Sequence, residues 1–144
     1  LRESAVSKVE ELNLFDNGIG PDGAKAIAAL CAVRTSLTSL SVAYNSIVGD
    51  GAQQLASAVL AKPNIDNFSG IPLKELRADS LTTLNLSGRA LGVPEAIVLA
   101  DLLRSVSGSL TRLDVSYNYL DRGGQGVKIL RDAVSGRKGF VLIE

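Results

Sequence analysis

The chain contains no histidine, tryptophan or methionine, and its single cysteine is Cys31. Within the 144 residues, these absences exclude zinc sites built from cysteine and histidine, an imidazole general base and a disulfide framework. Fifteen basic side chains balance fifteen acidic ones, so no net charge draws the chain to nucleic acid or to an anionic membrane. No apolar run approaches the roughly 20 residues that cross a bilayer. We therefore expect no nucleic-acid partner, no direct membrane insertion, no metal and no cofactor.

The length suits a single domain that spans residues 1–144. Because the chain begins with Leu1 instead of methionine, we expect it to be part of a longer polypeptide or assembly.

A repeated pattern organises the sequence. The stretches 12–19, 40–47 and 113–120 each follow the pattern apolar-x-apolar-x-x-Asn-x-apolar, and the first two begin 28 residues apart. A fourth copy, 84–91, keeps the apolar positions but has Arg89 in place of the asparagine. A fixed period of this size indicates a solenoid built from about five to six stacked repeats.

One repeat in the middle of the array is shortened. Phe68 begins a degenerate copy with Gly70 in its second apolar position, and only 16 residues separate Phe68 from Leu84. We predict that Phe68 fills the core of this shortened repeat, residues 61–80, and that the segment after Ile71 has space for about one helical turn. The alternating apolar residues predict short strands near 10–14, 38–42, 66–70, 82–86, 111–115 and 139–143.

A helix is predicted after most of these strands. Apolar residues recur there at helical spacing, as in Ala52, Leu55 and Ala56, and Asp22 and Asp50 stand where a helix N-cap is expected. The fold class is therefore α/β, with parallel strands stacked along a solenoid.

The combined pattern Leu-x-x-Leu-x-Leu-x-x-Asn-x-Ile, followed by Gly-Ala-x-x-Leu/Ile-Ala, resembles the ribonuclease-inhibitor-like class of leucine-rich repeats. The resemblance is strong in residues 9–60 and 81–120 and weak in 61–80. It implies a curved parallel sheet on the concave side and helices on the convex side. It also implies that Asn17, Asn45 and Asn118 form a structural ladder by turning inward and hydrogen-bonding backbone groups. Arg89 breaks this ladder; it is either solvated or marks a local site.

Strand alternation predicts which side chains face the concave side. They are Glu11, Asn13, Phe15, Ser39, Ser41, Ala43, Asn67, Ser69, Thr83, Asn85, Ser87, Arg112, Asp114 and Ser116. Aromatic residues and arginine are the usual anchors of a protein interface. The predicted partner-binding residues are Glu11, Phe15, Tyr44, Arg112, Asp114, Tyr117 and Tyr119. The alternative for Tyr44 and Tyr117 is that they only pack over neighbouring turns.

The C-terminal strand is predicted to be a docking edge. Residues 140–143 are apolar on both faces, which is typical of a strand that is buried on both sides. The N-terminal strand, with Val9, Leu12 and Leu14, also lacks a capping repeat before it. We expect at least one of the two ends to be covered by more of the same polypeptide or by another protein, and we assign Phe140 and Leu142 as the docking edge.

No set of residues predicts catalysis, because a hydrolytic site without histidine needs another base in a sequestered pocket. We expect a non-catalytic protein-protein interaction module. The alternatives are a structural subunit of a large complex and a GTPase-regulator-like repeat domain. The sequons that begin at Asn67 and Asn85 fall inside predicted strands, and together with the lone cysteine they favour an intracellular location, cytoplasmic or organellar.

Overall fold

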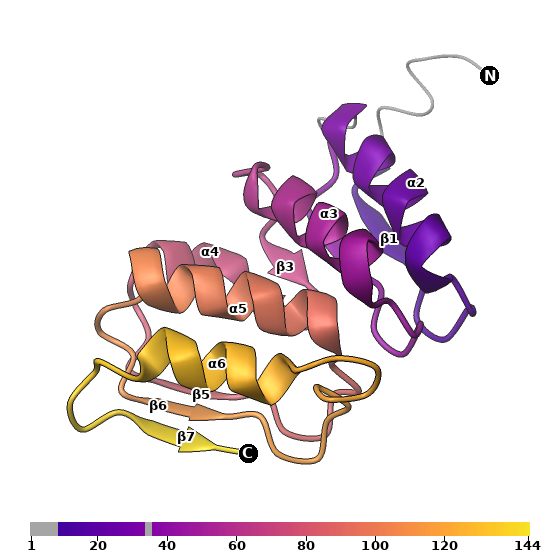
Figure 1. The fold of residues 1–144 in the computed structure, drawn as a ribbon. Helices are drawn as coiled ribbons and strands as arrows, with labels where there is room; N and C mark the ends of the chain where they lie inside the picture. The colour runs from indigo at the N-terminus through magenta and orange to yellow at the C-terminus, as the bar shows by residue number, and fades with distance from the viewer. Residues whose placement is uncertain (1–8, 34–35) are drawn as a thin grey trace.

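The computed structural model describes residues 9–33 and 36–144, and short strands alternate with helices along the chain (Figure 1). The strands are β1 (Glu11–Asn13), β2 (Ser39–Ser41), β3 (Asn67–Phe68), β4 (Ile71–Pro72), β5 (Thr83–Asn85), β6 (Arg112–Asp114) and β7 (Val141–Ile143). The helices are α2 (Gly20–Val33), α3 (Gly49–Leu60), α4 (Leu73–Arg77), α5 (Val93–Ser105) and α6 (Gly126–Val134). This is an α/β arrangement in which most strands are followed by a helix.

The strands form two sheets, ordered β1-β2-β3-β4 and β5-β6-β7. Within each run the repeats pair in parallel and in register, with Leu12 opposite Leu40 and Leu84 opposite Leu113. The central leucines Leu40 and Leu113 are fully buried. Equivalent residues of successive repeats therefore stack on one another.

The expectation of one parallel sheet through all repeats is wrong in the middle of the chain. After β3 the chain turns back through Ser69 and Gly70, both at positive φ (52° and 87°), and β4 pairs antiparallel with β3. A parallel crossover needs about a dozen residues or more and usually a helix, and the shortened repeat holds only the five-residue α4. The predictions for this repeat are confirmed, because α4 is about one turn long and Phe68 is fully buried.

The helices form a continuous layer across this break. Helix α2 packs on α3, α3 on α5, and α5 on α6, while the sheet ends between β4 and β5 (Figure 1). The helices approach closely: a Cβ on Gly51 would lie 2.3 Å from the carbonyl oxygen of Pro21. One hydrophobic cluster includes residues of both halves, among them Leu40, Phe68 and Leu113.

The sequence predictions for four residues need local correction. Asp22 and Asp50 lie in the first turns of α2 and α3 and are not N-caps, because each helix begins earlier, at Gly20 and Gly49. Ala43 and Ser69 are buried, 2% and 6% exposed, instead of facing solvent. Ala43 lies beyond the end of β2 and Ser69 lies in the turn between β3 and β4, so the strand alternation does not apply to them.

The described chain leaves its C-terminal strand partly exposed. Val141 is 44% exposed, and Phe140 and Leu142 are half-buried. The guanidinium of Arg137 lies 4.8 Å from the centre of the Phe140 ring. The covering predicted for this edge is therefore not supplied by the described residues. The corresponding prediction for the N-terminal end involves residues 1–8, which lie outside the described part.

Candidate functional site

The turn that follows each regular strand has the same backbone conformation in different repeats. Asp16, Tyr44 and Tyr117 occupy equivalent positions and have positive φ values of 54°, 60° and 58°. The shared conformation of this turn sets the direction in which the side chain of the next residue leaves the backbone. That residue is an asparagine in all three cases. The residue with positive φ meanwhile stands at the rim, where Tyr44 and Tyr117 are exposed.

Asn45 ties the first two turns together. Its Oδ1 accepts hydrogen bonds from the backbone N–H of Asn17 (2.7 Å) and of Ile19 (3.2 Å). Its Nδ2 donates to the carbonyl oxygens of Leu14 (2.7 Å) and Val42 (2.9 Å). We call such a set of bonds a rung.

Asn118 makes the equivalent rung in the second sheet. Its Oδ1 accepts from the N–H of Arg89 (2.9 Å) and of Leu91 (3.0 Å), and its Nδ2 donates to the carbonyl of Leu86 (2.8 Å). Asn17 is different: it is exposed, and its Nδ2 donates to the carbonyl of Phe15 (3.0 Å) in its own turn. Two of the three asparagines therefore connect one repeat to the next.

Three of the predicted partner-binding residues meet at the rim above these turns. The ring centres of Phe15 and Tyr44 lie 6.0 Å apart, and those of Tyr44 and Tyr119 lie 5.3 Å apart. The guanidinium of Arg122 stands over both tyrosines, 5.7 Å from the centre of Tyr44 and 4.8 Å from that of Tyr119. We call Phe15, Tyr44, Tyr119 and Arg122 the aromatic cluster. It joins the first two repeats to the loop after β6.

Sequence reasoning missed Arg122. The residue lies outside the repeat pattern, in the loop before α6, and its one signal is its position three residues after Tyr119. Only the folded chain shows that this loop reaches back to the second repeat.

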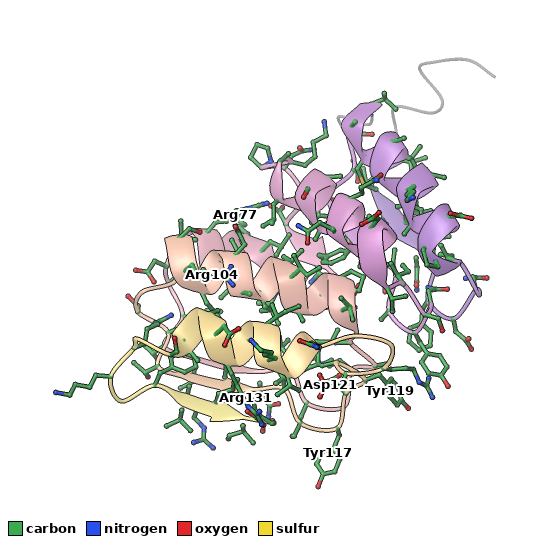
Figure 2. The ribbon with its side chains drawn as sticks, viewed as in Figure 1. Arg77, Arg104, Tyr117, Tyr119, Asp121 and Arg131 are labelled. Carbon is green, nitrogen blue, oxygen red and sulfur yellow. The ribbon has the colours of Figure 1, made fainter. Side chains whose placement is uncertain are left out.

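The other predicted partner-binding residues lie apart from the aromatic cluster. Tyr117 is 90% exposed and points away from the body of the molecule (Figure 2). Glu11 lies on β1, and Arg112 and Asp114 lie on β6. We call these three strand residues the strand face. Asp114 accepts hydrogen bonds from the hydroxyl and the N–H of Ser116, which lower the pKa of its carboxyl group. These residues provide a polar surface along the strands.

A pocket of about 240 Å³ opens beside the aromatic cluster. Its lining includes Asp16, Asn45, Ile47, Pro94, Glu95, Tyr119 and Arg122. The pocket therefore lies between the turn of the second repeat and the beginning of α5, where the two sheets are separated.

Glu95 is the buried charged group of this pocket, 2% exposed. Its Oε1 accepts the backbone N–H of Gly92 (2.7 Å), and its Oε2 accepts the hydroxyl of Ser69 (3.0 Å). Burial raises the pKa of the Glu95 carboxyl, and these hydrogen bonds partly oppose the rise. In the repeat pattern Glu95 stands where Gly23 and Gly51 precede the helical spacing of other repeats, and this position gives it no functional role. A glutamate at the third position of a helix is the capping-box signal that could have assigned its bond to Gly92.

The described residues contain no group of three or more His, Cys, Asp or Glu side chains arranged to hold a metal ion. Among the helices of the same part of the chain, none is long and apolar enough to cross a membrane. Cys31 is buried in α2, and burial raises the pKa of its thiol, which disfavours the nucleophilic thiolate.

The family described as "Leucine Rich repeat" matches residues 7–28 and 34–56. The chain contains leucine-rich repeats. The two matched segments cover β1, β2 and parts of the helices that follow them, which are the first two leucine-rich repeats of the stack. Leucine-rich-repeat domains generally mediate protein-protein interactions. A search of curated proteins found no match to this chain.

Proposed function

We propose that this leucine-rich-repeat chain is a non-catalytic protein-interaction domain of the ribonuclease-inhibitor-like class. It binds a protein partner through the aromatic cluster and the strand face. The observation that carries the proposal is the stack of Phe15, Tyr44 and Tyr119 with Arg122 over the two tyrosines.

The chemistry of the aromatic cluster suits an interface centre. Its rings remain 40–47% exposed although they stack on one another. Tyrosine and arginine are enriched among the residues that contribute most to protein binding, because they bury a large area and lose little conformational freedom. The mutual stacking also holds the side chains in place before a partner arrives, which lowers the entropy lost on binding.

The strand face, apart from the aromatic cluster, supplies the polar part of the proposed interface. Glu11, Arg112 and Asp114 carry both signs of charge. Polar residues at the edge of an interface contribute mainly to specificity and association rate. We therefore expect substitutions in the aromatic cluster to reduce affinity more than substitutions on the strand face.

The proposal is tested by affinity capture from native extract with quantitative mass spectrometry. The immobilised wild type is compared with Tyr44→Ala, Tyr119→Ala and Arg122→Ala. Tyr117→Ala is the matched control, because Tyr117 has the same turn conformation as Tyr44 but lies outside the aromatic cluster. A partner that the control retains and the three variants lose supports the proposal. Equal recovery of every partner by all five proteins would refute it.

A second candidate function is a structural subunit of a larger complex, with Phe140 and Leu142 as a docking edge. The half-buried strand β7, paired on one side to β6, favours it. A subunit co-purifies with its neighbours in fixed stoichiometry, whereas a recruited partner exchanges. Replacement of Leu142 by lysine should release such neighbours but leave a partner bound by the aromatic cluster in place.

A further inference from the structure

The series of asparagine rungs is interrupted at the junction of the two sheets. The second turn, residues 44–47, repeats the first turn, residues 16–19: φ is 60° and 54° at Tyr44 and Ser46, and 54° and 62° at Asp16 and Gly18. In the first turn, the N–H groups of residues 17 and 19 donate to the asparagine of the next repeat. By the same geometry, the N–H groups of Asn45 and Ile47 point toward the repeat that follows them.

The following repeat supplies no asparagine to receive these N–H groups. The shortened chain has turned back at Ser69 and Gly70, and the hydroxyl of Ser69 accepts only the N–H of Val42 (3.1 Å) from this region. Arg89 is exposed, with its Nη1 beside Gly70, 3.1 Å from where a Cβ would stand.

In the described ranges, 9–33 and 36–144, the N–H groups of Asn45 and Ile47 have no hydrogen-bond acceptor. These two residues are only 3% and 4% exposed. Buried backbone donors are nearly always paired, so an unpaired couple calls for a ligand or an ordered water.

The 240 Å³ pocket occupies this gap. Its lining includes Asn45 and Ile47 from the second turn, the segment 92–95 at the beginning of α5, and Tyr44, Tyr119 and Arg122 of the aromatic cluster. One water molecule takes about 30 Å³ in the liquid, so the space exceeds that of a single solvent molecule. It is large enough for a side chain of several heavy atoms.

We propose that this pocket binds a carboxamide, the side chain of an asparagine or glutamine presented by a protein partner, in the position of the missing rung. The amide oxygen accepts the N–H groups of Asn45 and Ile47, as the Oδ1 atoms of Asn45 and Asn118 do in the intact rungs. The source of the carboxamide rests on the proposed function; the binding chemistry of the pocket does not.

The acidic side chains of the pocket select an amide over a carboxylate. Glu95 is buried in the wall, and Asp16 also lines the space. A second carboxylate beside Glu95 would repel it or force one of the two groups to take up a proton. An amide brings no charge, and its NH₂ group donates to an acceptor in the wall. An apolar side chain would leave both backbone donors unpaired.

The test is an NMR titration of the ¹⁵N-labelled 144-residue chain with phenylacetamide and, separately, with phenylacetate. The two probes have the same ring, which can stack on the tyrosines, and differ only in the polar group. Phenylacetamide should shift the backbone amide signals of Asn45 and Ile47 and bind about tenfold more tightly than phenylacetate, because Glu95 repels the carboxylate of phenylacetate and not the neutral amide. The amides of Asn17 and Ile19, which have the same turn but an intact rung, are the internal control. No shift at Asn45 and Ile47, or equal binding of the two probes, overturns the proposal.

The variant Glu95→Gln tests the origin of the selectivity. Its amide oxygen can still accept the N–H of Gly92, and the loss of the carboxylate should reduce the preference for phenylacetamide to about threefold or less, if Glu95 supplies at least half of a tenfold discrimination. Circular dichroism and the dispersion of the amide signals show whether the variant is folded. An unchanged preference in a folded variant overturns the role given to Glu95.

These titrations need no protein partner, so their failure is distinct from failure of the proposed function. If phenylacetamide leaves Asn45 and Ile47 unshifted while partner capture still depends on the aromatic cluster, the carboxamide site is wrong and the interaction domain stands. If phenylacetamide binds as expected and capture does not depend on the cluster, the pocket chemistry stands and the proposed interface is wrong.

Discussion

The first turn, residues 16–19, and the second turn, residues 44–47, have nearly the same backbone conformation. Among the described residues, only the first turn donates backbone hydrogen bonds to the repeat that follows it. The first turn donates the N–H groups of Asn17 and Ile19 to Asn45 Oδ1, and the N–H of Asp16 to the carbonyl of Ala43 (3.2 Å). Residues 44–47 have no such bonds among the described residues. The repeat after the second turn differs from the regular repeats in two ways: it lacks the asparagine, and its chain turns back at Ser69 and Gly70.

At the junction the molecule is joined by its helices and core instead of its sheet. Helix α3 packs on α5 across the break, and the fully buried Phe68 belongs to the hydrophobic cluster that both halves share. Hydrophobic contacts need no fixed register, whereas a strand ladder does, so the helix layer tolerates a shortened repeat that the sheet does not.

The largest loss of stability is expected at the stacked leucines of the two sheets. Leu40→Ala and Leu113→Ala should each lower the free energy of unfolding by about 2–5 kcal/mol, because each empties a fully buried position. Since the halves share a hydrophobic cluster, either variant should still unfold in one transition. Urea melts followed by circular dichroism and by tyrosine fluorescence measure both quantities. Two separated transitions would show that the junction uncouples the halves, and a cost below about 1 kcal/mol would contradict the core assignment.

Breaking an intact rung should cost less than emptying the core. Asn45→Ala and Asn118→Ala each leave two backbone N–H groups without their acceptor, so we expect a loss of about 1–3 kcal/mol. Asn17→Ala is the matched control: Asn17 is exposed and bonds only within its turn, so its replacement should change stability by less than about 0.5 kcal/mol. Chemical denaturation of the three variants checks the comparison. Equal costs at Asn17 and Asn45 would be evidence against the rung.

The Glu95 carboxyl should make the stability of the junction depend on pH. Burial raises its pKa in the folded state, so the folded protein holds this proton at a higher pH than the unfolded chain does. Stability should therefore fall as the pH rises from the ordinary glutamate value of about 4.3 through the raised pKa, and then stay level. Glu95→Gln lacks this titration. The difference between urea midpoints should shift in favour of the variant as the pH rises over that window, and a constant difference would contradict the burial effect.

The smallest effect is expected from restoring the repeat consensus at Arg89. Arg89→Asn should change stability by less than about 0.5 kcal/mol, because Arg89 is exposed and the chain before it turns back at Ser69 and Gly70. The preceding repeat therefore places no regular turn next to residue 89, and an asparagine there would have no backbone N–H groups of such a turn to accept. Thermal melts of the variant and the wild type give the comparison. Stabilisation by more than about 1 kcal/mol would mean that the residue, and not the short chain, interrupts the rungs.

Much of the fold could be predicted from the repeat pattern because each strand and helix is local. The 28-residue spacing places Leu12 beside Leu40, and the structure pairs them in register. The same pattern placed Phe68 in the core and limited α4 to about one turn. It could not show that β4 turns back on β3, because a hairpin of this size has only Ser69 and Gly70 as its signal.

The candidate site was less predictable, since its residues come from separate repeats. The sequence predicted Phe15, Tyr44 and Tyr119 as partner-binding residues, but it could not show that their rings stack on one another. Arg122 was missed because it lies outside the repeated positions, and Glu95 was missed because it stands where other repeats have a glycine, Gly23 or Gly51, at the start of a helix.

The sequence by itself determined the periodic part of this protein: the strands, their leucine register, the helices, and the asparagines at the turns. These features repeat at short range, and each follows from side-chain alternation and helical spacing. Only the tertiary structure decided where the sheet ends, that Arg122 covers Tyr44 and Tyr119, and that Asn45 and Ile47 face a pocket instead of a rung. The physical reason is that these outcomes depend on how a shortened repeat packs between two regular runs, which no local pattern encodes.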